Sequence, residues 1–349
     1  MSALKTEHIK IERIEEQSDA LHHAADILKR GGLVVFPTET VYGLGGNALD
    51  AEAASKIYAA KGRPSDNPLI IHIANPADAE HYAKTNEVYE RLAKAFMPGP
   101  LTVILPKRDC IPYSVTGGLD SVAVRCPSHP VANRLIALAK IPIAAPSANI
   151  SGKPSPTKAS HVAEDLDGRV DVILDGGECE IGLESTIVRV DGENSITLLR
   201  PGAVTYDALC MVCEQVTVAD AVIHRLAEGE RPLSPGMKYR HYAPNAPVVL
   251  LKGDEERVLA FLQAEQQHTN CAILCFDEET VHLQAKNLLP IGPKTDLAAH
   301  AKNLFSALRR ADATDAEIVY AHLPSMDGLG LALYNRMIRA AAHTVKEII

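Results

Sequence analysis

The stretch Pro37–Gly45 reads PTETVYGLG and directly follows Leu33–Phe36, a short apolar run typical of a β-strand. In α/β folds, residues that follow a strand in this way commonly carry ligand-binding groups. Its threonines offer hydroxyls, and its glycines allow a ligand to approach the backbone closely. A simple polar turn is the alternative interpretation. The stretch therefore predicts an α/β domain with a candidate binding loop.

Alternating apolar patterns and capping residues extend this prediction over the first part of the chain. We expect helices at 18–30, 50–60, 86–96 and 130–139. We expect strands at 33–36, 69–73, 101–105, 122–126, 141–145, 170–174, 186–190 and 196–199. Strands interleaved with helices predict an α/β domain with a mixed sheet that ends near Pro201-Gly202.

The second part of the chain is predicted to be a smaller, Rossmann-like α/β domain with a parallel sheet. Its expected elements alternate: strand 248–251, helix 255–267, strand 272–276, helix 296–311, strand 318–323 and closing helix 332–348. A proline-rich segment precedes it. We therefore predict a catalytic domain at 1–210, a linker or lid at 211–246 and an accessory domain at 247–349.

Composition limits the possible partners. The chain has 349 residues, a net charge of −9 and no tryptophan, which argues against a broad nucleic-acid-binding surface. A polyanion would need a local cluster of cations. The N-terminus has no apolar signal region, and no apolar run is long enough to span a membrane. Seven scattered cysteines suggest reduced thiols and a cytoplasmic protein, and the lone Cys210/Cys213 pair is weak evidence for metal or redox chemistry.

The common nucleotide-binding and hydrolase motifs are missing: no GxxxxGK[ST], GxGxxG, HExxH or GxSxG is present. The segment Lys61–Pro68, KGRPSDNP, holds two cations around a glycine at a predicted helix end. Such cations can simply complement a helix C-terminus. Because Pro64 restricts the backbone beside them, we also consider a polyphosphate site.

Three further segments carry polar side chains beyond what packing requires. Residues 145–157, APSANISGKPSPT, offer hydroxyls, an amide and backbone N–H groups that can cradle an anion, or they form a plain loop. Arg125, Glu184-Ser185-Thr186 and Arg200 lie at predicted strand ends, where single arginines usually form surface ion pairs. The linker segment 234–244, SPGMKYRHYAP, has the aromatic and cationic content of a lid.

Together these segments resemble the YrdC-like threonylcarbamoyl-AMP synthase family in its longer, two-domain form. The resemblance covers nearly the whole chain and rests on eight strings in order: PTETVYGLG, KGRPSDNPL, MPGPLT, SVAVRCPSHP, APSANISGKPSPT, ESTIV, RPG and SPGMKYRHYAP. Lys61, Arg63, Ser147 and Asn149 match the family's KxR…SxN signature.

The resemblance implies a nucleotidyltransferase of tRNA processing. L-threonine, bicarbonate or CO2, and ATP would yield threonylcarbamoyl-AMP and pyrophosphate, and the product would serve threonylcarbamoyl-adenosine formation beside the tRNA anticodon. It implies an open, twisted YrdC-like sheet with a positive concave cavity. Mg²⁺ would arrive on ATP, with no metal held by the protein. Transient contact with the downstream tRNA threonylcarbamoyl transferase is expected, whereas membrane contact and direct tRNA binding are not.

The resemblance also assigns roles to residues. Lys61 and Arg63 would be catalytic. ATP would be bound by Lys61, Arg63, Ser65, Thr116, Ser147, Asn149, Ser155, Arg200 and Tyr239. Threonine would be bound by Thr38, His72, Arg125 and Ser185. No general base is identified, with Glu39 as one hypothesis. Replacing Lys61 or Arg63 by alanine is expected to lower activity by orders of magnitude with little change in melting temperature.

Two alternatives remain open. A non-enzymatic RNA-binding module could use the same cations, although the acidic total and scarce aromatics count against it. A carbamoyl-transfer accessory protein could use a similar fold on another substrate, but it would be expected to carry additional modules. The accessory domain is predicted to brace the linker.

Overall fold

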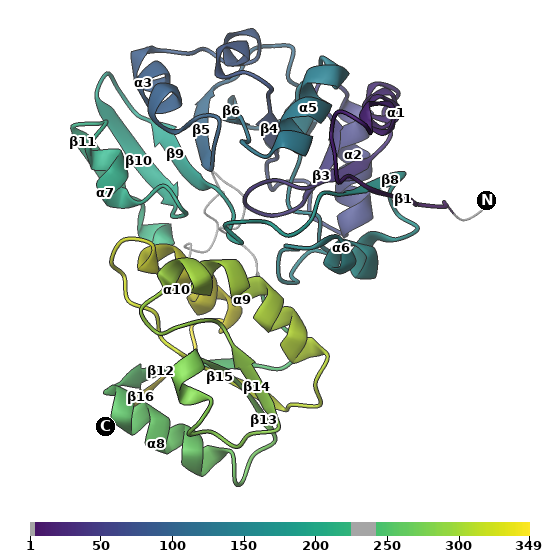
Figure 1. The fold of residues 1–349 in the computed structure, drawn as a ribbon. Coiled ribbons are helices and arrows are strands. Elements are labelled where there is room, and N and C mark those ends of the chain that lie inside the picture. The colour runs from purple at the N-terminus through teal and green to yellow at the C-terminus, as the bar shows by residue number, and fades with distance from the viewer. Residues whose placement is uncertain (1–3, 225–241) are drawn as a thin grey trace. The chain divides into compact units, whose positions relative to one another are not determined.

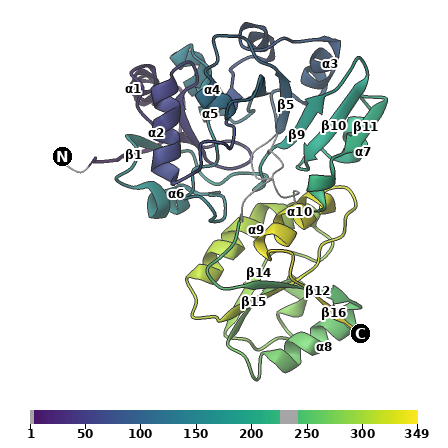
Figure 2. The same ribbon diagram turned by 180° about the vertical axis from the view of Figure 1, so that it is seen from behind.

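The computed structural model describes residues 4–224 and 242–349. The chain divides into two compact units (Figures 1 and 2). Unit 1 comprises Met1–Ser151, Pro156–Glu180 and Glu184–Lys238; unit 2 comprises Gly152–Ser155, Ile181–Leu183 and Tyr239–Ile349. The predicted linker, 211–246, begins with residues that belong to unit 1. Its residues 225–241 lie outside the described part of the chain.

Unit 1 is built on a mixed sheet of eleven strands in the order β1-β8-β2-β3-β7-β4-β6-β5-β9-β10-β11. The strands are β1 Glu7–Lys10, β2 Val34–Phe36, β3 Gly43–Asn47, β4 Ile70–His72, β5 Leu101–Pro106, β6 Ser121–Arg125, β7 Ile143–Ala144, β8 Val172–Asp175, β9 Thr186–Val190, β10 Ser195–Arg200 and β11 Gln215–Val218. Both parallel and antiparallel neighbours occur, such as β4 with β6 and β5 with β6. The predicted mixed sheet is confirmed.

The helices of unit 1 cover this sheet (Figure 1). They are α1 Ser18–Lys29, α2 Ala51–Lys61, α3 Glu87–Phe96, α4 Tyr113–Thr116, α5 Pro130–Ala139, α6 Ala159–Leu166 and α7 Tyr206–Cys210, with 3-10 turns η1 Pro76–His81 and η2 Asp220–Val222. Leu21 and Leu28 of α1 and Leu135 of α5 pack in one core cluster with Phe36 and Val172 of the sheet. Apolar burial of this kind is the main force that holds the helices on the sheet.

The last three residues of the predicted binding loop Pro37–Gly45 belong to a strand. Gly43–Asn47 forms β3, which pairs antiparallel with β2 and β7. A β-carbon on Gly45 would lie 2.8 Å from both the Ile143 and the Phe36 side chains, so only glycine fits between them. Glycine-rich segments are locally typical of turns. Here the packing of larger side chains against the glycine backbone stabilises a strand instead.

Unit 2 contains a sheet of five parallel strands in the order β14-β13-β15-β12-β16. They are β12 Val248–Gly253, β13 Cys271–Cys275, β14 Asn287–Pro290, β15 Ile318–His322 and β16 Val345–Ile348. The helices are α8 Glu255–Glu265, α9 Leu297–Asp312 and α10 Gly330–Ala340, with a 3-10 turn η3 Asp277–Glu279. Helix α8 lies on one face of the sheet, and α9 and α10 lie on the other (Figures 1 and 2).

The predicted closing helix at 332–348 is wrong in its last part. Helix α10 ends at Ala340, and Ala342 and His343 have left-handed backbones with φ of 48° and 66°. The chain then adds β16 beside β12. Pairing with an open sheet edge outweighs the helical pattern because that pattern is short there. In the described residues, no helix is long and apolar enough to cross a membrane.

Candidate active site

Arg125, at the end of β6, forms a buried ion pair with Glu39. Its Nη2 donates to Glu39 Oε1 at 2.7 Å, and both side chains are 5% exposed. The other carboxylate oxygen of Glu39 accepts from the backbone N–H groups of Ser128 and His129, at 3.2 and 3.4 Å. Burial alone would raise the pKa of Glu39, but the adjacent guanidinium holds it below its usual value. Glu39 is therefore an anion that orients Arg125.

One atom of this arginine lacks a protein partner. Arg125 Nε is buried, and no acceptor among the described residues lies within hydrogen-bond distance of it. Buried polar atoms are almost always satisfied, so an unsatisfied donor in a fixed guanidinium indicates room for a ligand oxygen. An arginine presents its donors in a planar fork that suits a carboxylate.

His72 lies beside this pair. It is the last residue of β4, and the parallel register sets it next to Arg125. Its Nδ1 lies 3.3 Å from the Ile143 carbonyl oxygen, so Nδ1 carries the proton and Nε2 is an acceptor. Burial and the neighbouring guanidinium lower the pKa of His72 to about 3. The imidazole is therefore neutral near pH 7.

The hydroxyl groups of Ser185 and Thr102 and the guanidinium of Arg200 form a further cluster on the same sheet. Ser185 Oγ and Thr102 Oγ1 lie 2.7 Å apart, and Thr102 is the cross-strand partner of Arg125. Arg200, at the end of β10, donates from Nε to the Ser185 carbonyl oxygen and from Nη2 to Ser185 Oγ, at 3.0 and 3.1 Å. Arg200, which was predicted to bind ATP, thus contacts Ser185, which was predicted to bind threonine.

Lys61 belongs to a separate group of residues, which were predicted to bind ATP. It ends α2, where Gly62 takes a left-handed conformation, and it is 2% exposed. Its Nζ donates to the carbonyl oxygens of Ser147 and Asn149, both at 2.5 Å. Ser147 Oγ in turn lies 2.6 Å from Asn149 Oδ1. The Lys61 ammonium therefore holds the SxN loop, residues 147–149, in place through the carbonyl oxygens of Ser147 and Asn149.

Helix α4 brings the remaining nucleotide candidates to the same region. The Tyr58 hydroxyl donates to the Asn67 and Ser114 carbonyl oxygens, both at 3.1 Å, which ties α2, the 62–68 loop and α4 together. Arg63 Nη2 donates to the Asn67 and Pro68 carbonyl oxygens within that loop. Ser65 is exposed in the loop. Thr116 is buried and donates to the Leu119 carbonyl oxygen at 2.7 Å.

The stretch Pro37–Gly45 connects the group around Arg125 with the group around Lys61. At its start, Thr38 Oγ1 accepts from the Thr40 and Val41 N–H groups at 3.2 Å and so shapes the turn that presents Glu39. At its end, Gly43 pairs with Ser147, and the Ala148 N–H donates to the Tyr42 carbonyl oxygen at 2.8 Å. One segment therefore contacts both the Arg125–Glu39 pair and the SxN loop.

The structure does not test the predicted roles of two further residues. Ser155 is buried and lies in the segment Gly152–Ser155 of unit 2. Tyr239 lies outside the described residues, as do Lys238 and Arg240 of the linker. Sequence reasoning also missed two contributors: Thr102, whose motif MPGPLT was noticed without a role, and Glu39 as the partner of Arg125. A threonine aligned with an arginine on a neighbouring strand becomes visible only once the strand register is known.

The thiols and the potential metal ligands of the described residues bear on the chemistry of the site. No group of three or more His, Cys, Asp or Glu residues in ranges 4–224 and 242–349 could hold a metal. Cys126 and Cys179 lie near the Arg125–Glu39 pair, and burial raises the pKa of each thiol to about 12. Protonated thiols are poor nucleophiles, so the arrangement favours binding and orientation of charged substrates over covalent catalysis.

Comparisons with known proteins identify the family of this chain. Residues 26–202 match the Sua5/YciO/YrdC family model, described as "Telomere recombination", and residues 204–342 match the model described as "Threonylcarbamoyl-AMP synthase, C-terminal domain". The chain is 44% identical over 346 residues to a threonylcarbamoyl-AMP synthase of Pyrococcus abyssi, covering 97% of this chain and 98% of that protein. It is 44% identical over 325 residues to the Bacillus subtilis protein of the same name, covering 92% and 93%.

Solved structures give the same result. The crystal structure of P. abyssi Sua5 complexed with L-threonine matches with a TM-score of 0.90 at 42% identity, covering 99% of both chains. The E. coli YciO structure matches with a TM-score of 0.51 at 22% identity over 57% of this chain and 96% of that one, which supports the fold of unit 1.

Proposed function

The chain belongs to the Sua5/YciO/YrdC family of threonylcarbamoyl-AMP synthases, and from this premise we propose that its substrates are L-threonine, bicarbonate and ATP. The enzyme is of the nucleotidyltransferase type, which transfers AMP. In the proposed reaction the threonine amine and bicarbonate form a carbamate with loss of water. A carbamate oxygen attacks the α-phosphorus of ATP, and pyrophosphate leaves with the electron pair of the broken P–O bond.

The Arg125–Glu39 pair is the observation that carries the threonine part of this proposal. Glu39 fixes the guanidinium from one side, and the unsatisfied Nε is a donor for the substrate carboxylate. The neutral His72 ring offers Nε2 as an acceptor for the threonine hydroxyl. The Ser185–Thr102 hydroxyl pair adds polar groups next to Arg125 in the strand register. The complex of P. abyssi Sua5 with L-threonine supports the same ligand here.

Lys61, Arg63 and the SxN loop are proposed to hold the triphosphate with its Mg²⁺. The backbone geometry of that loop is set by the Lys61 ammonium, so Lys61 both supplies positive charge and shapes the site. Neutralising the pyrophosphate as it departs and aligning the carbamate behind the α-phosphorus are the main tasks in such a transfer. No residue needs to become covalently attached to the nucleotide.

Glu39 is better suited to orient Arg125 than to act as the general base. A base must accept a proton in the working pH range. The lowered pKa of Glu39 makes it a weak base, and both its oxygens already accept hydrogen bonds. His72, with a pKa of about 3, is also a weak base. We propose that bulk solvent or the substrates themselves take up the proton released by the threonine ammonium.

The product is proposed to serve tRNA modification. Threonylcarbamoyl-AMP is a mixed anhydride with AMP as a good leaving group, so it suits a second enzyme that transfers the threonylcarbamoyl group to an adenosine beside the anticodon. The acidic chain, with no tryptophan, does not need to bind the tRNA itself. Transient contact with the downstream transferase would protect the reactive product from water.

Pyrophosphate release tests the proposed function. With ATP and Mg²⁺, release should require both threonine and bicarbonate, and mass spectrometry should detect threonylcarbamoyl-AMP. Arg125→Gln should lose threonine-dependent release, because the substrate carboxylate loses its fixed partner. Arg189→Gln is the matched control, since that arginine lies on the same sheet but pairs with Asp191 and is 40% exposed. Pyrophosphate release that ignores threonine in the folded protein would contradict the proposal.

A further inference from the structure

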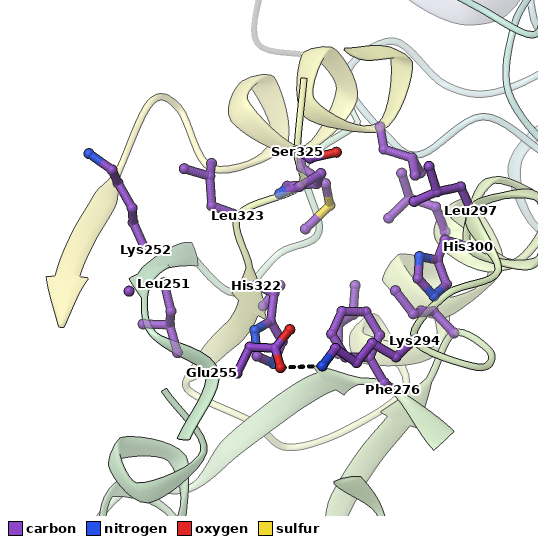
Figure 3. Close-up of a pocket in the computed structure, with 18 residues that line it drawn as sticks. Leu251, Lys252, Glu255, Phe276, Lys294, Leu297, His300, His322, Leu323 and Ser325 are labelled. Carbon is purple, nitrogen blue, oxygen red and sulfur yellow. Dashed lines mark hydrogen bonds and ion pairs between the residues drawn. The ribbon is translucent and has the colours of Figure 1, made fainter. Parts of the chain in front are cut away.

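Unit 2 contains a cavity of about 380 Å³ at the carboxyl ends of its strands. Residues Leu251–Gly253 from the end of β12 and Ala321–Leu323 from the end of β15 line it (Figure 3). Cavities of this size hold small molecules. The site lies within unit 2 and does not depend on the function proposed for unit 1.

The strand order makes this position the expected ligand site of the sheet. From β12 the chain crosses through α8 toward β13, whereas from β15 it crosses through α10 toward β16 on the other side. The two helices consequently cover opposite faces (Figures 1 and 2). A crevice opens where neighbouring parallel strands send their helices to opposite faces, and open α/β sheets bind ligands in that crevice. Strands β12 and β15 are such neighbours.

The interior of the cavity combines apolar side chains with stacked rings. Leu274, Leu304 and Met337 are buried there. The Phe276 ring stacks with His300 at 5.1 Å between centroids and with His322 at 4.8 Å, with interplanar angles of 23° and 24°. A flat, unsaturated ring can extend such a stack, whereas a branched aliphatic group cannot.

The imidazoles are suited to ring contacts and hydrogen bonds. His300 Nε2 lies 2.8 Å from the Pro293 carbonyl oxygen, and His322 Nε2 lies 2.7 Å from Glu279 Oε1. These bonds orient both rings and do not involve Nδ1 of either. Metal binding is not indicated, because the described part of the chain has no cluster of three potential ligands.

Lys294 at the rim is suited to an anionic group on the ligand, and it interacts electrostatically with Glu255, Glu278 and Glu279. Lys294 forms an ion pair with Glu255 beside the cavity (Figure 3), and the two side chains are 43% and 62% exposed. An exposed ion pair contributes little stability, so Lys294 can exchange its partner for a ligand anion. Leu297, the first residue of α9, also lines the cavity, but the Asp296 carboxylate already accepts from the Ala299 N–H at this helix N-terminus, so Lys294 supplies the positive charge for a ligand anion. By contrast, Glu255 and Glu256 in the first turn of α8 disfavour a phosphate there.

We infer that this cavity binds a small organic anion with a flat heteroaromatic ring, the ring stacking with Phe276, His300 and His322 and the anionic group pairing with Lys294. A nucleoside monophosphate and an aromatic carboxylate share this chemistry. AMP and indole-3-acetate are the probes that distinguish them.

Methyl NMR on the full-length protein gives a local readout. Met337 lines the cavity, whereas Met97 belongs to unit 1 and reports binding there separately. With ¹³C-methyl-methionine labelling, AMP or indole-3-acetate should shift the Met337 signal by its ring current, with a Kd below about 1 mM. Adenosine lacks the anion and inorganic phosphate lacks the ring, so each should bind at least about tenfold more weakly.

Two variants and a matched control complete the test. Lys294→Gln should raise the Kd roughly three- to tenfold, and Phe276→Leu should weaken only the probes that carry a ring. Lys286→Gln should leave the Kd unchanged, because Lys286 forms an exposed ion pair with Asp315 and does not line the cavity. The inference is wrong if neither AMP nor indole-3-acetate moves Met337 up to about 10 mM. It is equally wrong if phosphate alone reproduces the shift, or if the two lysine variants behave alike.

Discussion

Arg125 and Glu39 should depend on each other energetically, and a double-mutant cycle can measure this dependence. The pair is 2.7 Å apart with both side chains 5% exposed, so each single change strands a buried charge. Arg125→Met leaves the carboxylate with only the Ser128 and His129 N–H groups, at 3.2 and 3.4 Å. Glu39→Gln leaves the guanidinium without a counter-charge. Each single variant should lose about 3–5 kcal/mol of unfolding free energy.

The double variant removes both charges at once. It should cost about 1–3 kcal/mol, because a buried amide and a thioether replace the ion pair and no isolated charge remains. The coupling energy is therefore expected to be at least about 3 kcal/mol, whereas uncoupled sites add within about 0.5 kcal/mol. Urea unfolding followed by circular dichroism, with the methyl signal of Met97 assigning the transition to unit 1, provides the measurement. Additive costs would refute the reasoning.

The acid dependence of the same pair gives a second check. The folded-state pKa of Glu39 lies below its ordinary value, so Glu39 contributes stability at pH values above about 4.3. That contribution is lost as the pH falls through the folded pKa. The stability difference between the native protein and Glu39→Gln should therefore shrink below about pH 4. In turnover, Glu39→Gln should raise the threonine KM at least about tenfold and change the ATP KM little. A constant stability difference down to pH 3 would contradict the assignment.

Three further outcomes are expected. The His72 ring signals should not titrate between pH 5 and 8, because its pKa is about 3, and a proton-dependent shift in ¹⁵N NMR over that range would disprove a neutral ring. Lys61→Ala should lower both activity and melting temperature, because the buried Lys61 ammonium holds the carbonyl groups of Ser147 and Asn149. Arg63→Ala should mainly lower activity. Equal melting temperatures of the two variants would contradict the structural role of Lys61, which the sequence alone did not predict. Gly45→Ala should destabilise the fold by about 1–3 kcal/mol in a thermal melt, since its β-carbon would meet Ile143 and Phe36 at 2.8 Å, and an unchanged melting temperature would mean that these side chains yield freely.

Several elements were predictable because their signals are local. The helix Pro130–Ala139 was predicted at its observed bounds, and α2 agrees within a residue, with Asp50 as its cap. Apolar spacing and capping act over a few residues and so can be read along the chain. The strand character of Gly43–Asn47 and Val345–Ile348 was missed, because neighbouring strands and packed side chains decide it.

The candidate site divides in the same way. The residue types in PTETVYGLG, the KxR segment and the SxN loop are visible in the sequence, and they suffice to indicate the chemistry of an anionic substrate. The pairing of Arg125 with Glu39 joins residues 86 positions apart, and the Thr102–Ser185 contact joins residues 83 apart. The register of β4, β6, β5 and β9 sets such contacts. Local preferences carry no information on register, so the sequence by itself determined which groups are present, and only the tertiary structure decided which of them meet and which charges are buried together.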